Sequence, residues 1–474
     1  MPPSHVRTNS VQDELVALGH NWFIHNPNQR AVRVRYEAID SAHPALRTAE
    51  NSLNKIAGIL LQIDGCRATI VPCLHRSEIQ DNRHVLGIVL HMTMLNLEVL
   101  EMVHLMQSAV PVHLFIGEPL TTATSFELYS PDKVTIPDHL EPGDPLFCSA
   151  TQRAMVFGAY LHAADDDNAL YGITVGQAVV PHSGFAMHPR LKPRGFHERR
   201  VRSSQLAIQQ LGRPLSNPAT QVVEQAIRAS ELEQARIYAE LERTGQDEGS
   251  PLVQRRLQQH QMQILRLRES LTHCHQYDVG HACAAEALIR PCNSTDHRRH
   301  SGRGTSHHSK RYDDGHTHLL SWTLMRMASK TTDNPVTLHA YPGTLERGAR
   351  VSMHVRDPNI ERPLGPYREG VVNGAPATVI IGGQMAREWS IFPAPGHNSI
   401  KFAARGDAGA LVTSALGATP EEGAVVAPLA LLYAAPERGP YGLVTPLTTV
   451  LRRIRDVTGL QLRFQGSWWR NNYV

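Results

Sequence analysis

The stretch "KFAARGDAGALVTS", residues 401–414, places a Gly-Asp-Ala-Gly turn directly before a run of small apolar residues. Glycines on both sides of an aspartate are typical of a tight turn, because glycine adopts backbone conformations that other residues avoid. The run after the turn has the short, apolar character of a buried β-strand. The sequence therefore predicts a sharp turn that leads straight into a strand of a β-rich core.

Similar short β-like runs recur on the N-terminal and C-terminal sides of this turn. Glycine and proline separate runs such as "RAMVFGAYLHA", "ALYGITVGQAVV", "GVVNGAPATVII" and "GAVVAPLALLYAA". This spacing predicts an all-β barrel or sandwich over residues 148–464. Residues 1–130 mix strand-like and helix-like periods and predict an α/β region, the Pro- and Asp-rich residues 131–147 predict a linker, and residues 465–474 predict a C-terminal tail.

The bulk properties indicate an intracellular globular protein. A chain of 474 residues can bury a large core in two or three domains, and a net charge of +3 predicts no general attraction to nucleic acid or membranes. The N-terminus lacks a basic region followed by an apolar core, and no apolar run is long enough to span a bilayer. Six cysteines are too sparse for a disulfide scaffold, so we expect free thiols.

No motif predicts a cofactor or a metal. Cys66 and Cys73 with His75 could suggest a metal site, but only these three candidates occur there and no fourth lies nearby in the sequence. A packed core is the favoured interpretation of these three residues. The His- and Arg-rich segment 295–311 predicts a disordered surface loop, and no aromatic residue interleaves its charge as a nucleic-acid site would need.

Residues 216–275 interrupt the series of strand-like runs and predict two helices. Asn217 before Pro218 and Ser250 before Pro251 each pair a capping residue with a proline at the first helical position. Leu257, Ile264 and Leu271 recur every seven residues in the second helix, as a narrow packing seam requires. Two interpretations remain open, namely an antiparallel hairpin that covers its own seam or the barrel wall, and a docking or dimerisation element.

The turn at 406–409 resembles the nucleophile turn of trypsin-like (PA clan, chymotrypsin-fold) serine proteases. That turn reads Gly-Asp-Ser-Gly in the family, and here it is Gly406, Asp407, Ala408 and Gly409. The segment "YGLVTPLTTVLRRIRDVTGL" is similar to the last strand, Thr-Pro stop and C-terminal helix of the family. The chain is more closely similar to a set of degenerate intracellular fungal proteins built on this fold.

Two further contexts carry the resemblance, in the order that the family requires. "LYGITVGQAVV" is similar to the strand that precedes the catalytic histidine, and Gln177 stands at the histidine position. "LLSWTLM" is similar to the context of the catalytic aspartate, and Ser321 stands at that position. The resemblance implies a mainly β, two-barrel fold over residues 148–464, with 216–275 as an inserted helical hairpin and with positions 177, 321 and 408 converging at the cleft.

All three catalytic positions depart from the family pattern together. The amide of Gln177 is not a base, Ser321 carries no charge to hold an imidazolium, and Ala408 has no nucleophile. The resemblance thus implies a protease fold without protease chemistry, acting as a binding or regulatory module for a protein or peptide. Asp407 could fold inward to brace the turn, and the N–H groups of Gly406 and Ala408 could bind a carbonyl or carboxylate, although a turn retained for packing is the favoured alternative.

Two other functions are considered. An active hydrolase could use a relocated triad drawn from His182, Asp313, Asp314 and Ser414. His182 and Ser414 stand five and six residues from the matched positions, on the order of 15–20 Å along a strand, whereas catalysis is lost at errors of about 1 Å. A purely structural protein could instead self-associate through the hairpin 216–275.

Overall fold

A computed structural model describes most of the chain. The described residues are 22–25, 34–77, 84–93, 110–120, 124–125, 140–148, 151, 153–164, 166–177, 179–180, 184–187, 208–210, 214–216, 220–244, 250–273, 278–292, 318–327, 338–355, 367–381, 383–395, 401–414, 426–437 and 439–464. The predicted loop 295–311, the predicted tail 465–474 and the alternative triad residues His182, Asp313 and Asp314 lie outside them.

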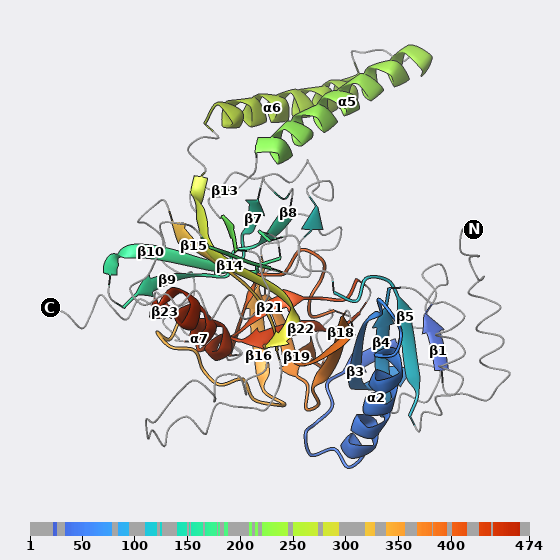
Figure 1. The fold of residues 1–474 in the computed structure, drawn as a ribbon. Helices are drawn as coiled ribbons and strands as arrows, with labels where there is room; N and C mark the ends of the chain where they lie inside the picture. Colours follow the sequence, from blue (N-terminus) through green and yellow to red (C-terminus); the bar gives the residue numbers. More distant parts are fainter. Residues whose placement is uncertain are drawn as a thin grey trace.

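The C-terminal part of the chain forms a closed barrel of six strands (Figure 1). Its strands, in order around the barrel, are β16 (Arg350–His354), β17 (Tyr367–Val372), β19 (Gln384–Pro393), β22 (Gly442–Pro446), β21 (Pro428–Ala434) and β20 (Leu411–Ser414). Every neighbouring pair is antiparallel, and the pairing of β20 with β16 closes the ring. The fold is therefore mainly β and contains a barrel, as the sequence predicts.

Side chains along the barrel strands point alternately into the barrel and toward solvent, and the inward ones fill its interior. In β17 the odd-numbered Tyr367 and Glu369 are exposed, whereas Arg368, Gly370 and Val372 are buried, the period of two expected for a strand with one solvated face. The interior cluster draws apolar side chains from every strand of the barrel and includes Val351, Met353, Val372, Ile391, Phe402, Val412, Leu432 and Val444. Burial of this cluster away from water supplies the main driving force for closing the sheet.

The N-terminal region extends the barrel sheet. Strand β18 (Ala377–Ile381) pairs with β19 on one side and with β3 (Arg67–Ser77) on the other. The sheet then continues through β4 (His84–Met92), β5 (Val112–Ile116) and β1 (Trp22–His25), while β2 (Val34–Glu37) also pairs with β3. Helix α2 (Leu46–Leu60) covers one face of this extension with Leu53, Ile56 and Leu60.

The division into residues 1–130, 131–147 and 148–464 stays a prediction. The ladder between β3 and β18 crosses that division, and β7 (Pro145–Cys148) begins inside the segment interpreted as a linker. The ladder of β3 with β18 joins the N-terminal region to the rest of the molecule through backbone hydrogen bonds.

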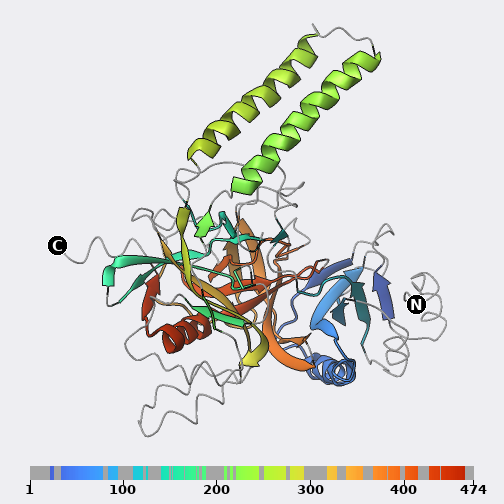
Figure 2. The same cartoon turned by 45° about the horizontal axis from the view of Figure 1, so that its top comes forward.

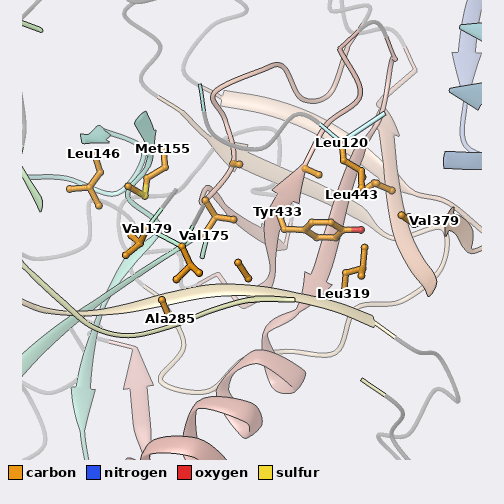
Figure 3. Packing of buried hydrophobic residues seen from close by; sticks show 14 of the residues in the cluster. Leu120, Leu146, Met155, Val175, Val179, Ala285, Leu319, Val379, Tyr433 and Leu443 are labelled. Atoms are coloured by element: carbon orange, nitrogen blue, oxygen red, sulfur yellow. The ribbon is translucent and has the colours of Figure 1, made fainter. Parts of the chain in front are cut away.

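The second sheet has eleven strands. Its path runs β23 (Leu462–Phe464), β9 (Ala159–Ala163), β10 (Asp166–Thr174), β15 (His318–Met327), β14 (Asp278–Cys292), β13 (Pro214–Ser216), β7, β8 (Arg153–Val156) and β6 (Thr124–Ser125), with β11 (Gly184–Met187) and β12 (Ile208–Gln210) attached. Among the described residues this path stays open, so the second barrel of a chymotrypsin-like fold stays a prediction. A large apolar cluster with members from both sheets holds them together (Figure 3).

Helices α5 (Thr220–Thr244) and α6 (Pro251–His273) pack as an antiparallel pair within the range 216–275 (Figure 2). Their ends return to one point of the second sheet, because Ser216 at the end of β13 is paired with Asp278 at the start of β14. Of the predicted seam, Ile264 is buried, and Leu257 and Leu271 are half-buried. The hairpin is thus inserted at the tip of a β-hairpin.

Helix α7 (Leu447–Thr458) packs its buried side chains Leu447, Val450 and Ile454 against the two sheets and ends at Gly459, whose φ is 78°. Glycine favours this left-handed conformation, which is common directly after a helix. None of the helices in the described ranges is long and apolar enough to cross a membrane.

Candidate functional site

The Gly-Asp-Ala-Gly turn packs directly against the second sheet. Gly406 and Gly409 have φ values of 98° and 104°, which L side chains rarely adopt. A Cβ atom on Gly409 would lie 2.1 Å from the carbonyl oxygen of Val156 and 2.4 Å from Oγ1 of Thr174. The N–H of Val156 also donates to the carbonyl of Ala408 at 2.8 Å. The turn therefore lies at the junction between the barrel and the second sheet.

A buried ion pair braces the turn from beneath. The carboxylate of Asp407 points inward and pairs with the guanidinium of Arg368 on β17, and both residues are about 2% exposed. The same carboxylate accepts the N–H of Ala404, and Arg368 also donates to the carbonyl of Phe402 at 3.4 Å. Charge-assisted bonds of this kind are stronger than neutral ones, so they hold the backbone of the turn in one conformation.

The side chain of Ala408, which the sequence resemblance matches to the nucleophile, belongs to an apolar cluster. Ala408 is 2% exposed, and its cluster includes Val175 and Val179 from the segment after β10, Ala285 from β14 and Tyr433 from β21. Figure 3 shows part of this cluster, with Val175, Val179 and Ala285 close together. A hydroxyl without a partner would cost about 1–3 kcal/mol in such surroundings. A methyl group suits this position better than a hydroxyl.

Gln177 follows β10 at a point where the backbone is tightly enclosed. A Cβ atom on Gly176 would lie 2.0 Å from the carbonyl oxygen of Glu286 and 2.8 Å from that of Trp322. Gln177 itself is half-buried, and its carbonyl accepts a hydrogen bond from Nη1 of Arg153 at 3.1 Å. Glycine at position 176 lets the end of β10 approach β14 and β15 closely.

Ser321 on β15 is buried and hydrogen-bonded to the backbone before Gln177. Its Oγ accepts the N–H of Gly176 at 3.2 Å, and the residue is 1% exposed. Thr323, two residues further along, donates to the carbonyl of Val175 at 3.1 Å. The strand that carries Ser321 is thus hydrogen-bonded directly to the segment that carries Gln177. The context of position 408 joins them through the shared apolar cluster and through the contact of Gly409 with Thr174.

The turn keeps two backbone donors. Within the described part of the chain, no acceptor is bonded to the N–H of Gly406 or of Ala408, whereas the N–H groups of Asp407, Gly409 and Ala410 are bonded within the barrel. Backbone N–H groups in a fixed turn can donate to a carbonyl oxygen or a carboxylate. Chemically the turn can bind such an oxygen, whereas its own carboxylate, that of Asp407, is buried and bonded to Arg368.

Sequence reasoning missed a buried imidazole–carboxylate pair. His318 on β15 and Glu388 on β19 lie 3.2 Å apart, and both are at most 5% exposed. The N–H of Leu319 also donates to Glu388. Nearby, burial and the charge of Glu388 raise the pKa of Tyr433. The pair joins the two sheets in the interior, and no local pattern in either strand signals it.

The three residues considered as soft ligands are divided between two faces of β3's sheet. Cys73 belongs to the large apolar cluster with members from both sheets, and Cys66 belongs to the cluster under α2. His75 is buried beside His113, with ring centroids 4.4 Å apart. Among the described residues, no group of three or more His, Cys, Asp or Glu side chains is placed to hold a metal ion.

Comparisons with known proteins give little further information. No protein-family model matches the chain, and no curated protein matches it. Among solved structures, the chain is similar to the NS6 protease of murine norovirus, in an inactive mutant form with a C-terminal extension. That similarity has 14% identity and a TM-score of 0.19, and it covers 35% of this chain and 88% of the viral one. A score this low supports no argument about function.

Proposed function

We propose that this chain is a catalytically inactive trypsin-like serine protease homologue, of the degenerate intracellular fungal type, that acts as a binding or regulatory module for a protein or peptide. The observation that carries the proposal is Ala408. Its methyl group is buried in an apolar cluster, on a turn whose glycines and buried aspartate match the nucleophile turn of the family.

The other two positions support the absence of catalysis. The Oγ of Ser321 accepts a hydrogen bond from the backbone N–H of Gly176. It therefore does not orient an imidazole, as the aspartate of a triad would. Gln177 offers an amide where a base is required. A protein that lacks the triad keeps only about 10³–10⁴-fold catalysis over water, from oxyanion binding and substrate binding. Peptide bonds would therefore survive contact with this turn.

The N–H groups of Gly406 and Ala408 are the proposed recognition element for a peptide carbonyl or a carboxylate. The ion pair between Arg368 and Asp407 supports this role, because it holds the donors in place before a ligand arrives. A turn retained only to pack the two sheets is the competing explanation, and the close approach of Gly409 to Val156 favours it.

An intracellular location is part of the proposal. The four cysteines in the described ranges, Cys66, Cys73, Cys148 and Cys283, are all buried free thiols. Burial raises the pKa of Cys283 to about 12, so this thiol stays protonated and unreactive. Unpaired, inert cysteines are typical of proteins that fold in a reducing compartment.

Labelling with a fluorophosphonate tests the absence of catalysis. We expect no covalent adduct by mass spectrometry on the folded chain, under conditions in which trypsin is labelled completely. The alternative of an active hydrolase predicts an adduct on a serine such as Ser414. In the structure, Oγ of Ser414 accepts the N–H of Ala427 at 3.0 Å and is therefore occupied by backbone. An adduct traced to Ser414 would restore the hydrolase.

A phage-displayed random peptide library tests the binding role. We expect enriched peptides to slow amide hydrogen exchange at Gly406 and Ala408, because these two N–H groups would gain an acceptor. Enriched peptides that protect only other parts of the chain, or failure to enrich any sequence, would favour the packing explanation over the binding module.

A further inference from the structure

The hairpin of α5 and α6 has its own core, separate from the two sheets. Val223, Ala226 and Ile227 of α5 pack against Ile264 and Leu267 of α6, and their cluster contains no residue of either sheet. Both views show the two helices projecting away from the sheets (Figures 1 and 2). With 25 and 23 residues, the helices are about 38 and 35 Å long. Most of their surface is therefore available to another molecule.

Large apolar side chains are concentrated on the outside of this hairpin. Of the eight exposed large hydrophobic residues in the described part of the chain, five lie here. They are Leu232 (72% exposed), Tyr238 (48%), Leu252 (76%), Met262 (49%) and Leu265 (54%). Full burial of one such side chain is worth about 1.5–3 kcal/mol. Burial of several of these side chains against another molecule would stabilise the hairpin considerably.

The two helices have opposite charge. Helix α5 contains five glutamates and three arginines, and α6 contains four arginines and one glutamate. This difference already joins the helices of one hairpin, since Arg268 pairs with Glu231 at 2.7 Å and Arg256 with Glu233 at 3.4 Å. An acidic helix beside a basic helix is thus the arrangement that this hairpin uses to pack.

We propose that the hairpin is a self-association element, and that its partner is the hairpin of a second copy of this chain. In a two-fold arrangement, the acidic α5 of each copy lies beside the basic α6 of the other, so acidic and basic helices alternate around a four-helix bundle. Each copy supplies both halves of the complementary surface, and the exposed apolar side chains fill the new seams. The proposal is independent of the function proposed for the turn.

Sedimentation velocity of the full chain tests the association, at concentrations from about 1 to 100 µM. We expect the wild type to be a dimer at the upper end of this range. The double variant Leu232→Gln with Leu265→Gln should be a monomer at every concentration. Its helical circular dichroism should match the wild type, because both side chains are exposed in the monomer. The matched control Tyr341→Gln with Met385→Gln removes two exposed apolar residues outside the hairpin and should remain a dimer.

A charge exchange tests the arrangement of the helices. One variant carries Glu224→Arg and Glu242→Arg on α5, and the other carries Arg255→Glu and Arg266→Glu on α6. Neither changes the pairs Arg268–Glu231 and Arg256–Glu233 within a hairpin. Each variant alone should be a monomer, and a mixture of equal amounts should form a heterodimer.

Three results would each overturn the proposal. They are a wild type that stays monomeric up to the highest concentration, a leucine double variant that still dimerises, and a mixture of the two charge variants that fails to associate. Dissociation of the Tyr341→Gln, Met385→Gln control would also overturn it, because the association would then use a surface outside the hairpin.

Discussion

The guanidinium of Arg368 forms a buried ion pair with the carboxylate of Asp407 and thereby ties strand β17 to the turn that precedes β20. Both residues are about 2% exposed, and they stand 39 positions apart in the sequence. A buried carboxylate and a buried guanidinium are each costly, but together they satisfy one another. The conformation of residues 404–410 therefore depends on a side chain from another strand.

Replacement of Arg368 should destabilise the protein strongly. Arg368→Met leaves the charge of Asp407 buried without its main partner, which typically costs about 3–5 kcal/mol. The double variant Arg368→Met with Asp407→Asn removes both charges and should lose much less. Urea unfolding of the wild type, both single variants and the double variant measures the coupling. Purely additive losses would mean that the two side chains act independently.

Introduction of a serine alone should not create catalysis. Ala408→Ser should stay unreactive toward fluorophosphonate, because an unassisted hydroxyl is a poor nucleophile at neutral pH. A gain should appear only when Gln177→His and Ser321→Asp are added, since triad members act as a unit worth about 10⁶ in rate. The two double variants that lack one member serve as controls. Equal labelling of the single and the triple variant would contradict this dependence.

Gly176→Ala should be among the most harmful small substitutions in the chain. The added Cβ would lie 2.0 Å from the carbonyl oxygen of Glu286, so two strands must separate, at a cost of about 3 kcal/mol, the upper end of typical over-packing penalties. Gly58→Ala in helix α2 is the matched control, because its Cβ would meet nothing within 4 Å and alanine favours a helix by about 1 kcal/mol. Thermal unfolding should therefore shift in opposite directions for the two variants, and a loss of stability in both would argue against the steric explanation.

Stability should fall in mild acid because of His75. Burial lowers the pKa of His75 below its ordinary value. The described titratable groups beside it are His113, whose ring centroid lies 4.4 Å away, Tyr36, its partner in the pairing of β2 with β3, and Cys73, two positions away on β3. With a folded pKa below the unfolded one, the unfolded chain binds more protons as the pH drops. Stability is therefore complete above about pH 6.5, the unfolded pKa of histidine, and decreases as the pH falls below it.

Urea unfolding at a series of pH values between about 5 and 7 measures this dependence. His75→Gln should flatten it. His339→Gln is the control, since His339 is exposed. An unchanged slope in His75→Gln would assign the acid sensitivity to other groups.

Deletion of the helical hairpin should leave the two sheets folded. Ser216 and Asp278 are directly paired in adjacent antiparallel strands, so a short turn can connect them without strain. We expect a single cooperative thermal transition close to that of the full chain. Loss of that cooperative transition would show that the hairpin is part of the folding core.

Local patterns in the sequence were sufficient to predict whether these segments form a helix, a turn or a strand. The seven-residue spacing of Leu257, Ile264 and Leu271 and the Ser250–Pro251 start predict the second helix, which begins at Pro251. The Gly-Asp-Ala-Gly turn and the apolar run behind it predict a tight turn before a strand, and β20 begins at Leu411. These features depend on neighbours a few residues apart, so the chain itself displays them.

Only the tertiary structure decided what those elements meet. The closure of the barrel, the ladder of β3 with β18, the partner of Asp407 and the pair of His318 with Glu388 all join residues far apart in the chain. Such pairings follow from strand register and from the burial of whole sheets, and they leave no periodic trace in either partner. The sequence by itself determined that position 408 carries no nucleophile. The fold determined that its methyl group is buried between two sheets, because the backbone at Gly409 packs directly against Val156 and Thr174.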